Sequence, residues 1–207
     1  MFSTLPKYLH FASIGTLLLS IILFLMSALL GRETVFLWFN TDLGKTGDLV
    51  FSTFTNLAEG WIWIPYFVIL FGWYKREASI ILYSFLISTL LTQIPKYLIW
   101  PNASRPMGAG IPPPAIHTVS GIDIHLTGSF PSGHSATAFT LYLLTLYFYP
   151  QKKVLFAGAL YAILCGYSRV YLAQHFPMDV AGGIIVALLS VYSSIYISKL
   201  KKHVSKN

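Results

Sequence analysis

Long apolar runs, separated by short polar segments, dominate the pattern of residues along this chain. A helix needs about 20 apolar residues to cross the hydrocarbon core of a bilayer, and six runs come close to that length. They are His10–Gly31, Leu57–Tyr74, Ala78–Trp100, Ser132–Tyr149, Val154–Tyr171 and Met178–Leu200. The pattern therefore predicts an all-α fold, an integral membrane bundle of six transmembrane helices that forms a single domain over residues 1–207.

Three segments depart from a simple span. The second run is the least regular, because Glu59 lies near its start and Pro65 lies within it. Just before it, Asp48–Ala58 has a mixed spacing that suits either a short helix on the membrane surface or an ordered loop. Pro101–Pro131 is rich in proline and glycine, which argues against a regular span. We expect this long loop, about 101–131, to be a functional lid or binding segment.

The composition excludes an ordinary soluble domain. Hydrophobic residues make up 55% of the chain and charged residues only 10%, against about 25% charged residues in globular domains, and the mean hydropathy is +0.65. The net charge is +7, but the basic residues form short clusters and no continuous stripe, so we expect no nucleic-acid partner. The single cysteine, Cys165, cannot build a disulfide framework and should be a small buried residue.

The distribution of charge predicts how the bundle lies in the membrane. The first run is too long for the core of a cleavable signal peptide, so we take it as the first of six spans. Six spans put both termini on one side, where Glu77 is the only acidic residue beside nine basic ones. These basic residues are Lys7, Lys75, Arg76, Lys152, Lys153, Lys199, Lys201, Lys202 and Lys206. The other side holds Glu33, Asp42, Asp48 and Glu59 with Arg32 and Lys45. By the positive-inside rule the termini are cytoplasmic and the long loop faces outward.

Six titratable side chains fall near the outer ends of the predicted spans. They are Lys96, Arg105, His134, Arg169, His175 and Asp179. A charged side chain at a helix centre costs about 2.5–3.5 kcal/mol on insertion scales, so such residues usually have a function. Three of the six are permanently basic and only one is acidic, whereas a structural ion-pair network would be closer to balanced. The excess of cations suggests an anion supplied from outside, and phosphate fits best. The alternative is that these residues only reach toward the membrane interface.

The segment Pro131-Ser132-Gly133-His134 opens the fourth predicted span. Ser132 is a natural N-cap of a helix, and Gly133 would let the backbone approach a ligand closely. The free N–H groups and the positive end of the helix dipole would face the same anion. His134 would then lie at the phosphate, one step into the helix.

A second segment, Ser168 to Asp179, joins the fifth and sixth predicted spans. Pro177 suits the first turn of the sixth helix. His175 and Asp179 are four residues apart, so they can meet on one side of the helix start. A carboxylate that accepts from one ring nitrogen leaves the other nitrogen free to attack, which suits a histidine nucleophile. The alternative is a helix cap with an ion pair.

With these segments the chain resembles the type 2 phosphatidic-acid phosphatase superfamily, the lipid phosphate phosphatases. That family has three signatures, and the second, Pro-Ser-Gly-His, is present as Pro131 to His134. The third, Ser-Arg, five residues, His, three residues, Asp, is matched without deviation from Ser168 to Asp179. The first, Lys, six residues, Arg-Pro, corresponds to Lys96 and Arg105–Pro106, which are separated here by eight residues.

The resemblance implies a role for each matched residue. His175 would be the nucleophile that forms a phosphohistidine, Asp179 would orient it, and His134 would be the general acid that protonates the leaving lipid oxygen. The phosphoryl oxygens would be bound by Lys96, Arg105, Ser132, Gly133 and Arg169, with Ser168 supporting the phosphate pocket. No metal or other cofactor would be needed, because the cations neutralise the developing charge.

The resemblance also implies the substrate class, a lipid phosphate met within the membrane, and indicates no obligate protein partner. The candidates are undecaprenyl diphosphate, phosphatidylglycerol phosphate, phosphatidic acid and the phosphates of lipid A. We favour undecaprenyl diphosphate or a lipid A phosphate, because the site is expected on the outer, periplasmic face. By the same resemblance we expect a bacterial inner (cytoplasmic) membrane protein.

Other classes of function stay open at this point. A transporter or flippase could bind a lipid phosphate through the same cations, although it would not require His134 and the His175–Asp179 pair. A catalytically dead scaffold would be expected to have lost one of those three residues. The vanadate-dependent haloperoxidases, which resemble the family in their anion pocket, are soluble and larger. His117 and His125 could form a metal site with Asp123, but we favour a mobile, solvated loop there.

Overall fold

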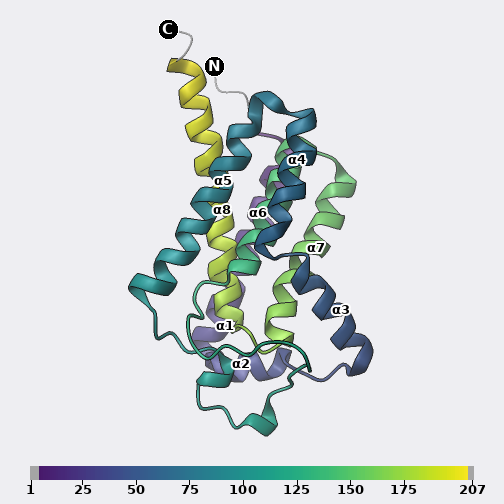
Figure 1. Cartoon of the computed structure of the whole chain (residues 1–207), viewed down its shortest axis with the longest axis vertical. Coiled ribbons are helices and arrows are strands. Elements are labelled where there is room, and N and C mark those ends of the chain that lie inside the picture. Colours follow the sequence, from purple (N-terminus) through teal and green to yellow (C-terminus); the bar gives the residue numbers. More distant parts are fainter. Residues whose placement is uncertain (1–4, 205–207) are drawn as a thin grey trace.

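Eight α-helices form the described part of the chain, and the longest of them lie side by side in a bundle (Figure 1). The computed structural model describes residues 5–204. The α-helices are α1 (Lys7–Leu30), α2 (Arg32–Phe39), α3 (Gly44–Asn56), α4 (Trp63–Trp73), α5 (Ala78–Ile94), α6 (Gly133–Phe148), α7 (Lys152–Tyr171) and α8 (Pro177–Val204). Shorter turns are η1 (Gly60–Ile62), η2 (Lys75–Glu77), η4 (Pro106–Gly108), η5 (Pro113–Ala115) and the π-helical turn η3 (Pro95–Ile99).

Within residues 5–204, four helical segments are long and apolar enough to cross a membrane. They are Lys7–Leu30, Ala78–Ile99, Lys152–Tyr171 and Pro177–Lys201, and a fifth span results if the bent pair Gly44–Asn56 and Gly60–Trp73 counts as one. The predicted all-α membrane bundle is therefore confirmed with four or five candidate spans, which is fewer than the predicted six. The remaining predicted span, Ser132–Tyr149, corresponds to α6. This helix has only 16 residues, fewer than the roughly 20 that usually cross a bilayer.

α6 lies at the centre of the bundle. Twelve of its 16 residues are buried, and its closest neighbours are α8 and α7. Because these helices shield it, α6 can carry polar residues such as Thr137 and Thr140, which are buried. α1 is the opposite case, because it turns large apolar side chains such as Phe11, Leu18 and Leu25 away from the bundle. Such a surface is expected of a helix whose outer face meets lipid.

The predicted second span, Leu57–Tyr74, is not one helix. α3 ends at Asn56, η1 follows, and α4 begins at Trp63; the axes of the two helical segments differ by 53°. Pro65 falls in the first turn of α4, where a missing N–H costs no intrahelical hydrogen bond. The proline therefore opens the helix here and does not interrupt a span.

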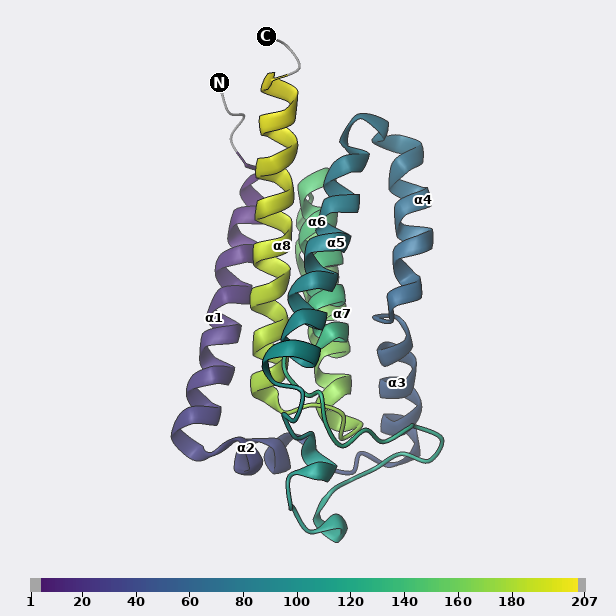
Figure 2. The same ribbon diagram turned by 60° about the vertical axis from the view of Figure 1, so that its left-hand side comes forward.

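Two helices lie outside the predicted spans. α3 covers most of the segment Asp48–Ala58, so the helical alternative for that segment is confirmed. It packs against α7 through Phe51, whose ring lies 4.8 Å from that of Tyr167 between centroids. α2 was not predicted; it lies across one end of the bundle, beside the end of α1 (Figure 2).

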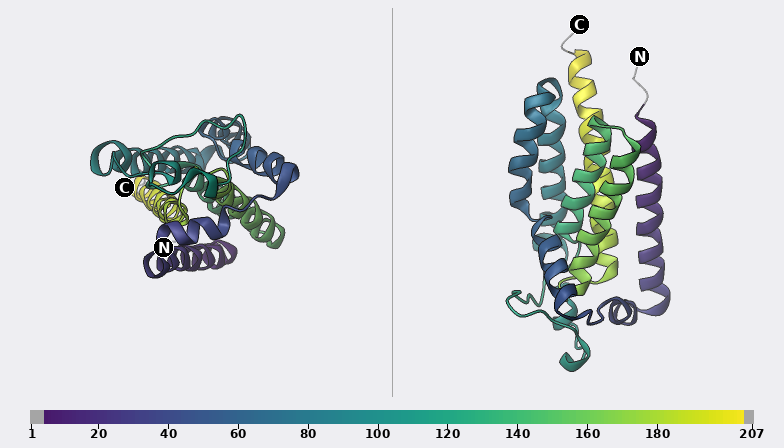
Figure 3. Two further views of the ribbon diagram at one scale, coloured as in Figure 1. Left: turned by 90° about the horizontal axis from the view of Figure 1, so that it is seen from below. Right: turned by 90° about the vertical axis from the view of Figure 1, so that its right-hand side faces the viewer.

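The two ends of the bundle differ in character. α1 begins and α8 ends at the same end, together with the α4–α5 and α6–α7 connections (Figure 3). The predicted basic clusters belong to these segments, except Lys206, which lies outside the described residues. The long loop between η3 and α6 lies at the opposite end with α2. The structure therefore separates the basic end from the loop end as the sequence predicted.

Small residues let the helices approach closely where the loop end meets the bundle. A Cβ atom on Gly183 of α8 would come within 2.6 Å of the carbonyl oxygen of Ser132, and one on Gly182 within 2.4 Å of the Phe130 ring. The glycine pair thus brings the start of α6 against the start of α8.

α1 is joined to α8 by a side-chain hydrogen bond, in which the Ser20 hydroxyl donates to the Ala181 carbonyl at 3.0 Å. Cys165 is buried as predicted.

Candidate active site

A cavity of about 430 Å³ opens among α4, α5, α6 and the loop end of α7. Six of the nine predicted site residues line it, namely Lys96, Arg105, Gly133, His134, Arg169 and His175. These residues come from four separate segments of the chain, so the fold gathers them as the sequence predicted. The rest of the wall follows one face of α5 and ends at aromatic side chains; it includes Ser88, Thr89, Thr92, Phe85 and Trp63.

Lys96 reaches the cavity from the π-helical turn that extends α5. The wide turn is closed by a hydrogen bond from the Trp100 N–H to the Pro95 carbonyl at 2.7 Å. A π-helical turn holds more residues than an α-helical turn, and a further turn follows before Arg105. The two additional residues between Lys96 and Arg105 are accommodated in this stretch, since both side chains still line one cavity.

The start of α6 forms another part of the cavity wall. Ser132 is the N-cap, as predicted, and its hydroxyl accepts from the Ser135 N–H at 3.3 Å. Gly133 and His134 occupy the first helical positions and line the cavity, where helix N–H groups have no intrahelical partner. The Lys96 ammonium lies 3.8 Å from the point that a Cβ on Gly133 would occupy. A ligand between them would meet a cation and a helix N-terminus together.

Arg169 lies in the last turn of α7 and is buried. One terminal nitrogen of its guanidinium donates to the Thr55 hydroxyl of α3. Its Nε, in contrast, is buried without a hydrogen-bond partner. An unpaired buried donor is costly, so this N–H is well placed to bind an anion in the cavity.

Arg105 is held differently, because its guanidinium is largely occupied by neutral acceptors of the protein. Nε donates to the Thr127 carbonyl at 3.0 Å, and Nη1 donates to the Gln174 carbonyl and to Oε1 of Gln174, both at 3.1 Å. Nη2 lies 3.4 Å from the Gly128 carbonyl. These bonds tie the end of the long loop to the α7–α8 connection. They do not neutralise the positive charge, which still acts on the cavity.

His175 lies in the connection between α7 and α8. The chain reverses there at Ala173, which has a positive φ of 54°, and the N–H groups of Gln174 and His175 both reach the Arg169 carbonyl, at 2.9 and 3.0 Å. The αL conformation is a usual way to end a helix, although glycine is the more common residue. The turn directs His175 back over the end of α7.

The environment of His175 favours its neutral form. The side chain is 2% exposed. Burial, with the nearby cations Arg105, Lys96 and Arg169, holds the pKa of His175 well below its usual range. A neutral imidazole has a free lone pair, which a nucleophile requires.

His175 and Asp179 meet as the four-residue spacing predicted. Nδ1 of His175 lies 3.5 Å from Oδ2 of Asp179, but this nitrogen is buried without a hydrogen-bond partner. Asp179 lies in the first turn of α8, which begins at Pro177 as predicted. The carboxylate is thus close enough to orient the imidazole after a small approach.

Two predicted phosphate-binding residues lie behind the cavity wall. The Ser168 hydroxyl donates to the Cys165 carbonyl of its own helix at 2.7 Å, and the Ser132 hydroxyl is engaged at the α6 cap. Both side chains are fully buried and neither lines the cavity. Both support the helix ends that carry Arg169 and His134, which agrees with the supporting role predicted for Ser168. Direct binding of phosphate by Ser132 stays a prediction.

Sequence reasoning missed four residues that the structure places at the site. Thr55 and Gln174 bind Arg169 and Arg105, as described above. The Ser129 hydroxyl donates to Oδ2 of Asp179, and His125 of the long loop lines the cavity. Thr55, Gln174 and Ser129 are far in sequence from the residues that they bind, and His125 belongs to no family signature. No local pattern therefore marks these four residues.

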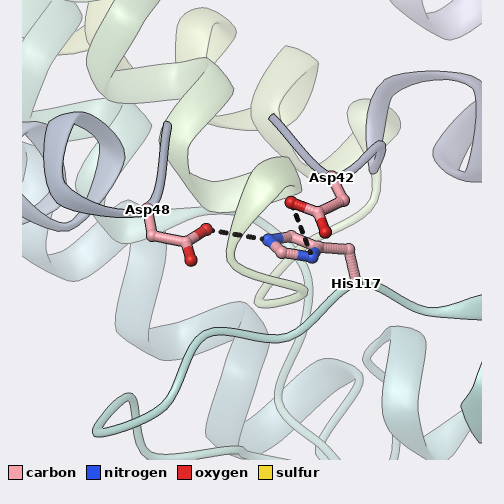
Figure 4. Close-up of side chains that lie close together, drawn as sticks. All are labelled: Asp42, Asp48 and His117. Carbon is pink, nitrogen blue, oxygen red and sulfur yellow. Dashed lines mark hydrogen bonds and ion pairs between the residues drawn. The ribbon is translucent and has the colours of Figure 1, made fainter. Parts of the chain in front are cut away.

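Asp42, Asp48 and His117 form a second cluster of titratable groups, near the loop end (Figure 4). Their donor atoms come within 4.8 Å of one another, so this is the group within residues 5–204 that could hold a metal ion. Nε2 of His117 lies 3.0 Å from Asp48, however, and Nδ1 lies 3.8 Å from Asp42. The two carboxylates face different ring nitrogens, so in this arrangement the three donors do not converge on one point.

The same cluster anchors the long loop. The Asn40 side chain accepts from the His117 N–H at 2.7 Å and donates to the carbonyls of His117 and Tyr171 at 3.1 and 2.8 Å. The Tyr171 hydroxyl donates to Asp48 at 2.7 Å. The prediction of a mobile, solvated loop is therefore wrong at His117, because long-range contacts hold this part of the loop.

Relatives of known name match the chain to different extents. An undecaprenyl-diphosphatase of Sulfolobus acidocaldarius is 29% identical over 87% of this chain and 88% of that protein. Phosphatidylglycerophosphatase B of Bacillus subtilis is 41% identical over 70 residues. That match covers 30% of this chain and only 34% of the relative's length.

The fold and the family agree with these matches. The crystal structure of Aquifex aeolicus LpxE superposes with a TM-score of 0.68 and 26% identity, over 79% of this chain and 93% of that one. A family model described as the PAP2 superfamily matches residues 77–202, a region that contains all nine predicted site residues. Because this match extends over more than half of the chain, the protein belongs to the PAP2 superfamily, the family that its motifs predicted.

Proposed function

We propose that this protein is a membrane phosphatase that hydrolyses a lipid phosphate through a phosphohistidine on His175. The observation that supports this most directly is the shared cavity, where three cations surround a neutral, buried histidine close to a carboxylate. A binding protein would gain nothing from keeping a lone pair free on a buried imidazole. An enzyme that attacks phosphorus requires it.

In the first step, the ring nitrogen of His175 that faces away from Asp179 attacks phosphorus. The bond from phosphorus to the leaving oxygen breaks, and protonated His134 gives its proton to that oxygen. This oxygen belongs to the lipid alcohol in a phosphomonoester and to the lipid monophosphate in a diphosphate. The phosphate charge favours the protonated imidazole of His134, and Asp179 stabilises the positive charge that develops on His175. Lys96, Arg105 and Arg169 stabilise the charge on the phosphoryl oxygens.

In the second step, His134 takes a proton from water, whose oxygen then attacks phosphorus. The phosphorus–nitrogen bond breaks, inorganic phosphate leaves, and His175 is again neutral. The lipid tail would leave the cavity along the face of α5, past Phe85 and Trp63, whose rings lie 5.4 Å apart between centroids. The phosphate would then lie at the loop end and the tail among apolar side chains.

Among the candidate substrates we favour undecaprenyl diphosphate. An undecaprenyl-diphosphatase of Sulfolobus acidocaldarius matches 87% of this chain and 88% of its own length, which supports this choice. Phosphatidylglycerol phosphate is the next candidate, because of the shorter match to phosphatidylglycerophosphatase B. Lipid A phosphates and phosphatidic acid complete the set to be tested.

Purified protein in detergent is expected to release phosphate from at least one of these lipids, with the same rate in EDTA as in buffer. The cation-lined cavity already supplies the positive charge that a metal would otherwise provide. Colorimetric phosphate release over the four lipids, with and without chelator, measures this. Activity that disappears in EDTA and returns with one divalent ion would contradict metal independence. Binding of the lipids without any release would favour a transporter or flippase instead.

We also propose six spans with cytoplasmic termini in a bacterial inner membrane. The bent pair α3–α4 and the shielded helix α6 would cross the membrane in addition to the four long helical segments. The basic end would face the cytoplasm. In a Cys165→Ser background, Ser120→Cys in the long loop should react with a membrane-impermeant maleimide in spheroplasts. Lys152→Cys should react only after lysis. Labelling in the reverse order would show that the orientation is wrong.

A further inference from the structure

One oxygen of the Asp179 carboxylate is bound by more than the histidine that it is expected to orient. Oδ2 accepts from the Ser129 hydroxyl at 2.5 Å and from the Phe176 N–H at 2.9 Å. His175 Nδ1 lies 3.5 Å from the same oxygen and makes no hydrogen bond. The closest donor to this carboxylate is therefore a serine outside the family signatures.

Ser129 is itself firmly placed. Its side chain is 1% exposed, and its N–H donates to the Ala103 carbonyl at 3.1 Å. It lies at the end of the long loop, three residues before the N-cap of α6. Ser129 thus connects the two ends of the loop, near Ala103, with the start of α8 at Asp179.

We propose that Ser129 is a positioning residue, which holds the Asp179 carboxylate where it can receive the Nδ1 hydrogen of His175. The inference rests on the proposed function, because it concerns the same reaction. Two fixed donors, one from the loop and one from the α8 start, leave the carboxylate little freedom to rotate. Nδ1 of His175 lies 3.5 Å from this same oxygen, so the imidazole needs to approach by only a short distance to bond it.

This arrangement also connects the long loop to catalysis. Without the Ser129 hydroxyl, only the Phe176 N–H would bind Oδ2, and the carboxylate could turn away from His175. The imidazole would then lose the bond that selects its attacking tautomer. Attack on phosphorus should slow, whereas binding of the lipid phosphate by Lys96 and Arg169 should be unaffected.

The test compares Ser129→Ala with wild type on the lipid that the wild-type enzyme hydrolyses best. We expect kcat and the single-turnover rate of phosphoenzyme formation to fall by about 10- to 100-fold, as for other residues that orient a catalytic group, with KM changed less than about 2-fold. Ser129→Thr keeps the hydroxyl and should recover most of the rate, whereas Ser129→Val, of the same shape as Thr, should not. Ser190→Ala, which removes a buried hydroxyl from α8 eleven residues beyond Asp179, should keep wild-type kcat.

The possible outcomes separate the two proposals. A wild-type enzyme that hydrolyses none of the lipids overturns the proposed function, and this inference with it, before any variant is compared. An active wild type with Ser129→Ala of equal kcat overturns the positioning role alone. If Ser129→Ala does not fold, the Thr and Val variants decide: equal rates in that pair overturn the role, and a rate lost only in Ser129→Val supports it.

Discussion

Replacement of His175 by alanine is expected to abolish phosphoenzyme formation and to lower turnover by on the order of 10⁴-fold or more, because the nucleophile itself is removed. The structure supports this role through burial, the neutral form of the imidazole and the nearby Asp179. No other histidine that lines the cavity lies beside a carboxylate at a helix start: His134 is on α6 and His125 on the loop. Neither is placed to replace it.

The measurement is a rapid-quench experiment under alkaline conditions, which preserve phosphohistidine, with a lipid substrate that carries a labelled phosphate. Wild type should show transient label on the protein, and His175→Ala should show none. His203→Ala is the matched control, because His203 is exposed on α8 at the opposite end of the bundle. Near wild-type turnover in His175→Ala would contradict the assignment. Label that persists on His134 would show that the two histidines exchange roles.

Replacement of His134 by alanine is expected to slow hydrolysis of the lipid substrate by about 10²–10⁴-fold, the usual contribution of a general acid. His134 lines the same cavity as His175, from the start of α6. A lipid alkoxide or a lipid monophosphate is a poor leaving group, so it needs a proton as the bond to phosphorus breaks. Without His134 that proton would have to come from water.

The leaving group provides the decisive comparison. Nitrophenol leaves from an aryl phosphate with little need of a proton. With this substrate, His134→Ala should therefore form the phosphoenzyme at a rate much closer to that of wild type. Phosphoenzyme formation with the lipid and with the aryl phosphate, measured for wild type and variant, tests this. An equal loss with both substrates would contradict the general-acid role and would indicate that His134 mainly binds the phosphate.

These two variants together distinguish an enzyme from a binding protein. A transporter that recognised lipid phosphate through Lys96, Arg105 and Arg169 would tolerate the loss of either histidine as long as the cations remained. An enzyme would lose chemistry while it still bound the lipid. Measurement of lipid binding by both variants, beside their turnover, therefore separates the classes of function that the motifs alone leave open.

Much of this protein could be predicted from local patterns. The apolar runs predicted an all-α membrane bundle, because in lipid each backbone polar group must be bound within its own helix. The Ser132 cap, the helix start at Pro177 and the proximity of His175 to Asp179 were also predicted, since capping and four-residue spacing act within one turn. Each of these features depends on residues that are close in sequence.

Other features followed from longer-range packing. The break between α3 and α4 and the short, shielded helix α6 changed the number of segments that are apolar enough to span. α6 can be short and partly polar because α7 and α8 cover it, which no pattern within α6 reveals. The π-helical turn at Pro95 likewise brought Lys96 to the cavity despite the longer spacing to Arg105.

The sequence by itself thus determined the membrane fold, the family and six of the residues that line the cavity, because helix periodicity and the signatures are local. Only the tertiary structure decided how those residues are supported. Ser129 is 50 residues from Asp179, Gln174 is 69 from Arg105, and Thr55 is 114 from Arg169. Contacts over such separations form only when packing brings distant segments together, so residue spacing along the chain contains no signal for them.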